Sequence, residues 1–122
     1  MAELVGLRAL VVEDEGGVAL LIEDMLAELG CEVAASVPTL TKALMASSAQ
    51  SFDFAVLDVN LDGQLVFPVA EVLRSREVPF VFSTGYGRIG LPETFRECEV
   101  LSKPFTIEQL KQKVLRILRR SR

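Results

Sequence analysis

The chain has 122 residues, enough for one hydrophobic core and too few for two ordinary domains. Half of the residues are apolar and a quarter are charged, which indicates a folded globular protein and excludes a disordered or collagen-like chain. With 13 Lys and Arg against 17 Asp and Glu, the formal net charge is -4, so nonspecific binding to nucleic acid phosphates is not expected. We therefore expect a single domain over residues 1–122.

The residue inventory restricts the chemistry of the chain. Histidine is absent, which excludes His-based triads, His metal ligands and imidazole acid–base catalysis. Cys31 and Cys98 are too far apart for a C-x-x-C motif, and we expect both to be reduced and structural. No apolar run approaches the roughly 18 residues of a membrane helix, and residues 1–3 lack the features of a signal peptide. We expect a soluble cytoplasmic protein that makes no membrane contact and uses carboxylates, hydroxyls, Lys or thiols.

Strands and helices alternate in the first half of the chain. Residues 9–12 form a short apolar run, typical of a strand buried on both faces, and the run stops at an acidic stretch. Apolar residues then recur with helical spacing over 18–29, and Gly30 follows as a C-terminal cap. The pattern next predicts a strand, a helix opened by a Pro-Thr pair and a buried strand, over residues 31–36, 38–49 and 54–57.

The second half continues the alternation with one irregular stretch. After a loop that contains Asp62-Gly63, a helix is predicted to start at Pro68, followed by a strand over 80–82. Three glycines and a proline interrupt residues 85–97, where only a short or irregular helix is expected. A brief strand and a final helix with a capping box follow, over residues 100–101 and 106–118. The basic residues of this helix end are expected to be solvated, namely Arg116, Arg119, Arg120 and Arg122.

The repeated order of strand and helix predicts a parallel sheet covered by helices on both faces. Ligands of such a sheet bind beyond the carboxyl ends of its strands, so the residues at these ends should converge. Three carboxylates in one pocket repel one another by about 4 kcal/mol per pair at 4 Å and a dielectric of about 20. A hard cation such as Mg²⁺ is the natural counterion, together with the lysine at the last strand end. The converging residues are Glu13, Asp14, Asp58, Ser83, Thr84, Ser102 and Lys103.

These motifs resemble those of response-regulator receiver domains, and the likeness spans essentially the whole chain. The matching motifs are an acidic pair, a phosphoacceptor, a switch hydroxyl and a Lys-Pro pair, at Glu13-Asp14, Asp58, Thr84 and Lys103-Pro104. Residues 67–70 and 82–86 further resemble a variant subgroup with a Phe-Ala-Thr-Gly-x-Tyr-like motif, in which Ser83 here stands for Ala. The resemblance implies a flavodoxin-like α/β fold, with a five-stranded parallel sheet of order 2-1-3-4-5 and helices on both faces.

The resemblance also implies a function in two-component or phosphorelay signalling. Asp58 would take a phosphoryl group from a histidine kinase or histidine phosphotransfer protein by in-line displacement. Thr84 and Lys103 would contact phosphoryl oxygens, and the Lys103-Pro104 bond would be cis. Mg²⁺ would be held by Glu13, Asp14 and Asp58 and by the backbone carbonyl of Asn60. We expect self-phosphorylation and slow dephosphorylation, no turnover of an external substrate and no attached output domain.

Two residues depart from the usual pattern of the family. Val100 stands where an aromatic residue is usual, and Gly85 follows Thr84 where Ala is more common. The usual relay from the threonine to the aromatic ring is therefore not expected. We hypothesise that phosphorylation is read through the loop 85–90, by Tyr86, rather than through the last strand.

Several alternatives stay open. A phosphorylation-independent interaction module is one, although the full set of site residues speaks against it. A Mg²⁺-dependent phosphatase with an Asp nucleophile, of the haloacid dehalogenase type, needs a second acid two residues after the nucleophile, where Asn60 stands. A flavin-binding flavodoxin is a further rival. The subgroup resemblance suggests partners among a variant class of histidine kinases and stress-response relays, no nucleic acid, and a homodimer as one option.

Overall fold

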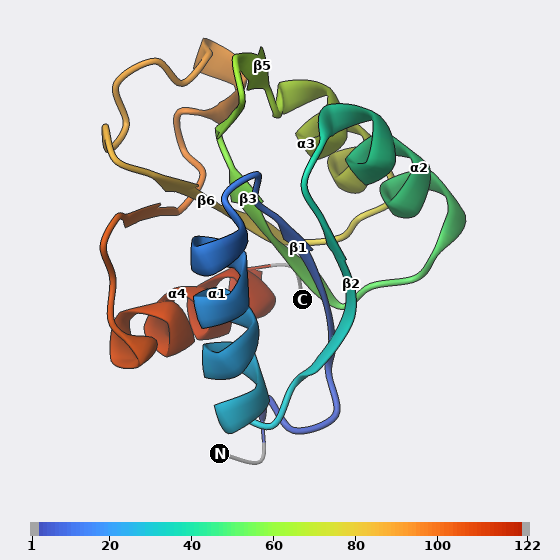
Figure 1. Cartoon of the computed structure of the whole chain (residues 1–122), viewed down its shortest axis with the longest axis vertical. Helices are drawn as coiled ribbons and strands as arrows, with labels where there is room; N and C mark the ends of the chain where they lie inside the picture. The colour runs from blue at the N-terminus through green and yellow to red at the C-terminus, as the bar shows by residue number, and fades with distance from the viewer. Residues whose placement is uncertain (1–2, 121–122) are drawn as a thin grey trace.

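A five-stranded parallel sheet forms the centre of the protein (Figure 1). The computed structural model describes residues 3–120, so Arg122 and the first two residues of the chain lie outside the described part. The strand order is β2-β1-β3-β6-β7, which is the 2-1-3-4-5 order expected from the sequence. The strands are β1 (Arg8–Val12), β2 (Glu32–Val37), β3 (Phe54–Asp58), β6 (Phe80–Thr84) and β7 (Val100–Ser102).

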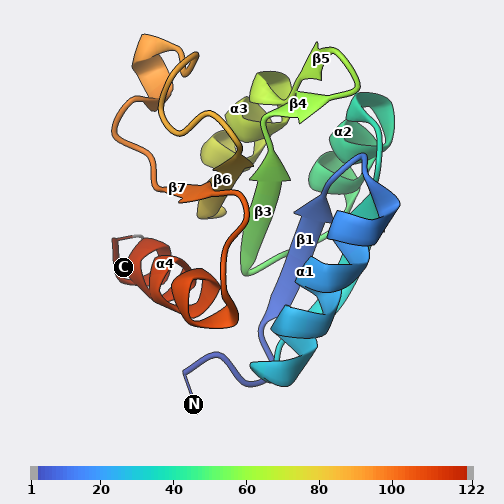
Figure 2. The same ribbon diagram turned by 60° about the vertical axis from the view of Figure 1, so that its left-hand side comes forward.

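Four α-helices cover the two faces of this sheet (Figure 2). Helices α1 (Gly16–Glu28) and α4 (Ile107–Arg120) pack on one face, over a core that includes Ile22 and Leu110. Helices α2 (Leu40–Ala49) and α3 (Phe67–Ser75) pack on the other face, over a second core. Because β1 and β3 are buried on both faces, they carry the continuous apolar runs seen in the sequence. The expected fold class is confirmed.

Two helix starts, those of α2 and α4, follow the predicted capping chemistry. The Thr39 hydroxyl accepts a hydrogen bond from the Lys42 amide at 3.2 Å, which caps α2. At the start of α4, the Thr106 hydroxyl accepts from the Gln109 amide at 3.1 Å, and the Gln109 side chain accepts from the Thr106 amide at 2.9 Å. This reciprocal pair is the capping box expected from the sequence. Both cysteines are free, as expected.

A small hairpin follows β3 where the sequence predicted only a loop. Its strands are β4 (Asn60–Leu61) and β5 (Gln64–Leu65), which pair antiparallel. The two residues between them, Asp62 and Gly63, have φ values of 53° and 90°. Two consecutive positive φ values make the tight turn that Asp-Gly favours, but strands of two residues are too short to show an alternating pattern.

The irregular stretch after β6 contains one 3-10 turn, η1 (Glu93–Phe95), and no α-helix. This outcome agrees with the expected short or irregular helix. The segment is held by Phe95, which is buried. The centre of its ring lies 5.5 Å from the centre of the Phe67 ring and 5.6 Å from the centre of the Phe82 ring. The Arg74 guanidinium lies 4.4 Å from the centre of the Phe95 ring and donates to the Thr94 carbonyl at 2.9 Å. These side-chain contacts add to short-range backbone bonds such as that from the Phe95 amide to the Pro92 carbonyl at 2.9 Å.

The basic end of the last helix is exposed at its described arginines, as expected, but two of these arginines also pair with a buried carboxylate. Glu99 is 4% exposed and pairs with Lys113 at 3.0 Å, Arg116 at 3.4 Å and Arg120 at 3.0 Å. Burial acts to raise the pKa of Glu99, but the three cations outweigh it and hold that pKa below its usual range. Sequence periodicity could not show this pairing, because the acid lies outside the helix. Among the helices of residues 3–120, none is long and apolar enough to cross a bilayer.

Candidate functional site

Strand periodicity aligns four polar side chains on one face of the sheet. Alternate residues of a strand face the same side. Apolar residues on this face pack beneath α1 and α4, and they are Val11, Val56, Val81 and Leu101. Backbone bonds from Glu13 to Val37 (3.1 Å) and from Lys103 to Thr84 (2.9 Å) extend the parallel pairing past the strand ends. Each of these apolar residues is followed two positions later by a polar residue on the same face, and these polar residues are Glu13, Asp58, Ser83 and Lys103.

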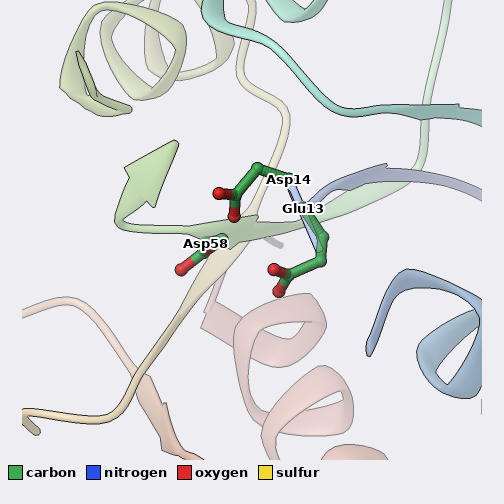
Figure 3. Close-up of side chains that lie close together, drawn as sticks. All are labelled: Glu13, Asp14 and Asp58. Atoms are coloured by element: carbon green, nitrogen blue, oxygen red, sulfur yellow. The ribbon is translucent and has the colours of Figure 1, made fainter. Parts of the chain in front are cut away.

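Three carboxylates gather at this edge (Figure 3). One carboxylate oxygen each from Glu13, Asp14 and Asp58 lies within 4.8 Å of the other two. Asp58 is 6% exposed and Glu13 is 3% exposed, whereas Asp14 lies on the exposed rim. The structure thus brings together the three acids that the sequence placed at two separate strand ends. Their mutual repulsion is the dominant electrostatic feature of the site.

Lys103 is the cation of the cluster. Its ammonium lies 2.9 Å from a carboxylate oxygen of Glu13 and 3.3 Å from a carboxylate oxygen of Asp58. Burial acts to lower the pKa of Lys103, but the hydrogen bond to Glu13 and the charges of both acids outweigh it and raise that pKa. The peptide bond between Lys103 and Pro104 is cis, as expected. One ammonium faces three acids, so the site holds more negative than positive charge.

The excess of acids changes how Asp58 binds protons. Burial, the hydrogen bond to Asp14 and the charge of Glu13 raise the pKa of Asp58 to about 7, while Lys103 opposes the rise. Burial also acts to raise the pKa of Asp14, but its hydrogen bonds with Asp58 and with backbone amides outweigh burial and lower that pKa. Of these two acids, Asp58 is therefore the one that takes up a proton more readily. A bound cation would compete directly with this proton.

Two hydroxyls follow each other on β6. Thr84 is 6% exposed, and its hydroxyl oxygen accepts from the Tyr86 amide at 3.1 Å, which leaves the hydroxyl proton free to donate. By strand alternation, Thr84 lies on the face of Phe82, toward the second core. Ser83 is fully buried on the opposite face. The sequence placed both hydroxyls at a strand end, but it gave no sign that the Ser83 hydroxyl would be inaccessible to solvent.

Asn60 lies beside the cluster in β4, directly after β3. Its side-chain oxygen accepts from the Gly63 amide at 2.6 Å, so this side chain is used by the hairpin turn. The Val66 amide donates to the Val59 carbonyl at 2.9 Å. In an antiparallel pair of strands, residue pairs that exchange backbone hydrogen bonds alternate with pairs that do not. Val59 and Val66 form a hydrogen-bonded pair, so the next pair, Asn60 and Leu65, exchanges no backbone hydrogen bonds. The backbone carbonyl of Asn60 is therefore not used by the hairpin.

Comparison with known families identifies the arrangement. A family model for the response regulator receiver domain matches residues 9–115. The chain belongs to this family. Receiver domains act in signal transduction, and the coarse functional interpretation of the sequence is therefore confirmed. In a comparison with curated proteins, no sequence matches the chain.

Solved receiver structures agree with this assignment. SdrG from Sphingomonas melonis Fr1 is 37% identical, with a TM-score of 0.83 over 94% of this chain and 98% of that one. The receiver domain of PhyR from Erythrobacter litoralis is 25% identical, with a TM-score of 0.83 over 95% and 92% of the two chains. A sensor histidine kinase receiver domain from Pseudomonas aeruginosa PAO1 is 26% identical, with a TM-score of 0.78 over 93% and 98%. That last structure has a magnesium ion coordinated in its active-site cleft.

Proposed function

We propose that this receiver domain is a phosphoacceptor module, in which Asp58 takes a phosphoryl group from a histidine kinase or histidine phosphotransfer protein. The observation that carries the proposal is the placement of Asp58. It is a buried carboxylate within 4.8 Å of two further acids and 3.3 Å from the Lys103 ammonium. Such a set supplies a nucleophile, ligands for a hard cation and a fixed positive charge for the incoming phosphate.

The donor set fits Mg²⁺. All candidate ligands are oxygens, and three acids face a single ammonium, so a divalent cation would balance the charge. Glu13, Asp14 and Asp58 would hold the ion together with the Asn60 carbonyl that the hairpin leaves unused. When bound, the ion would neutralise charge on the phosphoryl oxygens and lower the repulsion that an anionic donor meets.

The residues of the chain divide the remaining work. One oxygen of ionised Asp58 forms a bond to phosphorus as the bond from phosphorus to the donor imidazole nitrogen breaks, and that nitrogen keeps the electron pair. Lys103 moves from its carboxylate partners toward a phosphoryl oxygen, and the Thr84 hydroxyl donates its free proton to another. A bound cation would favour ionised Asp58 near neutral pH, because the neighbouring acids and burial raise the pKa of Asp58 to about 7.

The proposal has a direct chemical test. Wild-type protein and Asp58→Asn are incubated with Mg²⁺ and acetyl phosphate, and the intact mass of each is measured. We expect one phosphoryl adduct on the wild type, removed by hydroxylamine, and none on the variant. Asp24→Asn is a matched control, since Asp24 is an exposed acid on α1, away from the cluster, and should form the adduct normally. An adduct on Asp58→Asn, or none on the wild type, would contradict the proposal.

The same assay separates the rival functions. A pure interaction module would form no adduct, and a phosphatase would release phosphate steadily from added phosphoesters. We expect neither outcome, because Asn60 supplies no general acid and its side chain is committed to the turn. We also propose that residues 1–122 act as one domain that turns over no external substrate and signals through protein contacts.

The output is proposed to pass through the loop 85–90. Val100 is buried against the aromatic cluster and has no ring to reorient, whereas Tyr86 is 75% exposed and Ile89 is 83% exposed. The Tyr86 amide donates to the Thr84 hydroxyl at 3.1 Å. A rotation of that hydroxyl toward a phosphoryl group would change this bond and with it the start of the loop.

A further inference from the structure

The Ser83 hydroxyl is buried without a hydrogen bond. Ser83 is 0% exposed, and its hydroxyl oxygen has no partner within residues 3–120. A buried hydroxyl without a partner is destabilising, and Ala at this position would avoid the penalty without any change of fold. A cost of this kind in a folded protein calls for a specific explanation. The position of the side chain supplies one.

Ser83 lies under the central ion pair of the site. It is paired in register with Asp58 on β3, and its other neighbour in register is Leu101 on β7, two residues before Lys103. Strand β6 lies between β3 and β7, so the 3.3 Å contact from Lys103 to Asp58 crosses over β6. Alternation puts Ser83 on the face that carries both charged groups. The side chain of Ser83 therefore lies beneath the site, on the face of the sheet that Asp58 and Lys103 occupy.

We propose that Ser83 is a positioning residue for Asp58, and this inference rests on the phosphoacceptor function proposed above. In the unmodified protein, an Asp58 oxygen is bound to Lys103. When the phosphoryl group enters, Lys103 moves to a phosphoryl oxygen, and the Asp58 oxygen that is not bonded to phosphorus loses its hydrogen-bond donor while it still faces the cation that Asp58 would help to hold. The Ser83 hydroxyl then donates its proton to that oxygen and fixes the orientation of the carboxyl group.

A bond made only during reaction has a defined kinetic signature. It is absent in the ground state and present in both the transition state and the adduct, so it accelerates adduct formation. In hydrolysis of the adduct, the starting state and the transition state both contain this bond. Loss of the Ser83 hydroxyl should therefore change the hydrolysis rate little. Removal of the hydroxyl should also leave the unmodified fold as stable as before or more stable, because the unpaired group is lost.

The test compares Ser83→Ala and Ser83→Cys with the wild type. Cys keeps nearly the same volume with only a weak donor. The initial rate of adduct formation with acetyl phosphate and Mg²⁺ should fall 5- to 10-fold in both variants, which corresponds to about 1 to 1.4 kcal/mol of activation free energy. The acetyl phosphate concentration for half-maximal rate and the hydrolysis half-life should each stay within twofold of the wild type. Ser47→Ala is the matched control, because Ser47 is equally buried but donates to the Leu44 carbonyl at 3.2 Å, away from the site.

The results distinguish this inference from the proposed function. A normal wild-type adduct together with unchanged formation rates in the Ser83 variants would overturn the inference alone. A lower urea midpoint for unmodified Ser83→Ala would also overturn it, because the hydroxyl would then have a partner before reaction. Failure of the wild type to form an adduct would overturn both proposals. Slower formation in both Ser83 variants, with the Ser47 control unchanged, supports the inference.

Discussion

Replacing Asp58 by Asn should stabilise the protein in the absence of divalent cations. At a dielectric of about 20, repulsion of Asp58 by each of two acids within 4.8 Å is at least about 3.5 kcal/mol, and attraction to Lys103 at 3.3 Å is about 5 kcal/mol. The net repulsion is therefore at least about 2 kcal/mol. A rise of the Asp58 pKa from 3.8 to about 7 corresponds to about 4 kcal/mol. We expect Asp58→Asn to raise the free energy of unfolding by about 2 to 4 kcal/mol above pH 7.

The pH dependence of this gain has a fixed sign. The folded-state pKa of Asp58 is raised, so between pH 3.8 and about 7 the folded protein binds a proton that the unfolded chain has lost. Wild-type stability therefore falls as pH rises through this window and levels off above it. The Asn variant has no titratable group at position 58, so that position causes no fall in its stability as pH rises. The difference between the two proteins should be small near pH 4 and largest above pH 7.

Urea unfolding followed by far-UV circular dichroism, in EDTA at pH 5 to 8, measures this difference. Asp24→Asn controls for a change of net charge at an exposed position. Addition of Mg²⁺ should stabilise the wild type and narrow the gap. Equal or lower stability of Asp58→Asn at pH 8 in EDTA would refute the electrostatic reasoning.

Three further predictions concern other parts of the molecule. Glu99→Gln should lower the free energy of unfolding by about 1 to 2 kcal/mol at pH 7, because three cations lose a buried partner. Since the pKa of Glu99 is lowered in the folded protein, this loss of stability should disappear at pH values below that pKa, as measured by urea titration. Phe95→Ala should cost about 3 to 5 kcal/mol in the same assay, whereas Ile89→Ala, at an exposed position, should cost little. NMR shifts of residues 85–90 should change on addition of a beryllofluoride mimic of the phosphoryl group, and an unchanged loop would exclude it as the output.

Much of the site could be predicted because its residues follow strand ends. A parallel sheet brings the carboxyl ends of its strands to one edge, so apolar runs that end at Asp58 and before Glu13 were enough to predict their convergence. The same logic placed Lys103 beside them. Neither the burial of the Ser83 hydroxyl nor the raised pKa of Asp58 could be predicted, because both depend on distances between strands far apart in sequence.

The parts that were not predicted depend on tertiary contacts. The hairpin after β3 has strands of two residues, below the length at which a period of two can be recognised. The irregular segment is held by Phe95 and Arg74, which belong to different elements. Glu99 was not singled out, because an isolated acid before a short strand has no distinctive local pattern. Its three partners come from a helix whose basic residues also suit a solvated end.

The division of the interior into two cores has a consequence for how such a chain can vary. Thr84 lies on the side of the sheet that carries the phenylalanine cluster, whereas Glu13, Asp58 and Lys103 lie on the side of the core beneath α1 and α4. Substitutions on the phenylalanine side of the sheet should thus change the surroundings of the Thr84 hydroxyl while the charged side chains keep their alignment. A library randomised on that side alone would separate the role that we propose for Thr84 and loop 85–90 from the role that we propose for Asp58.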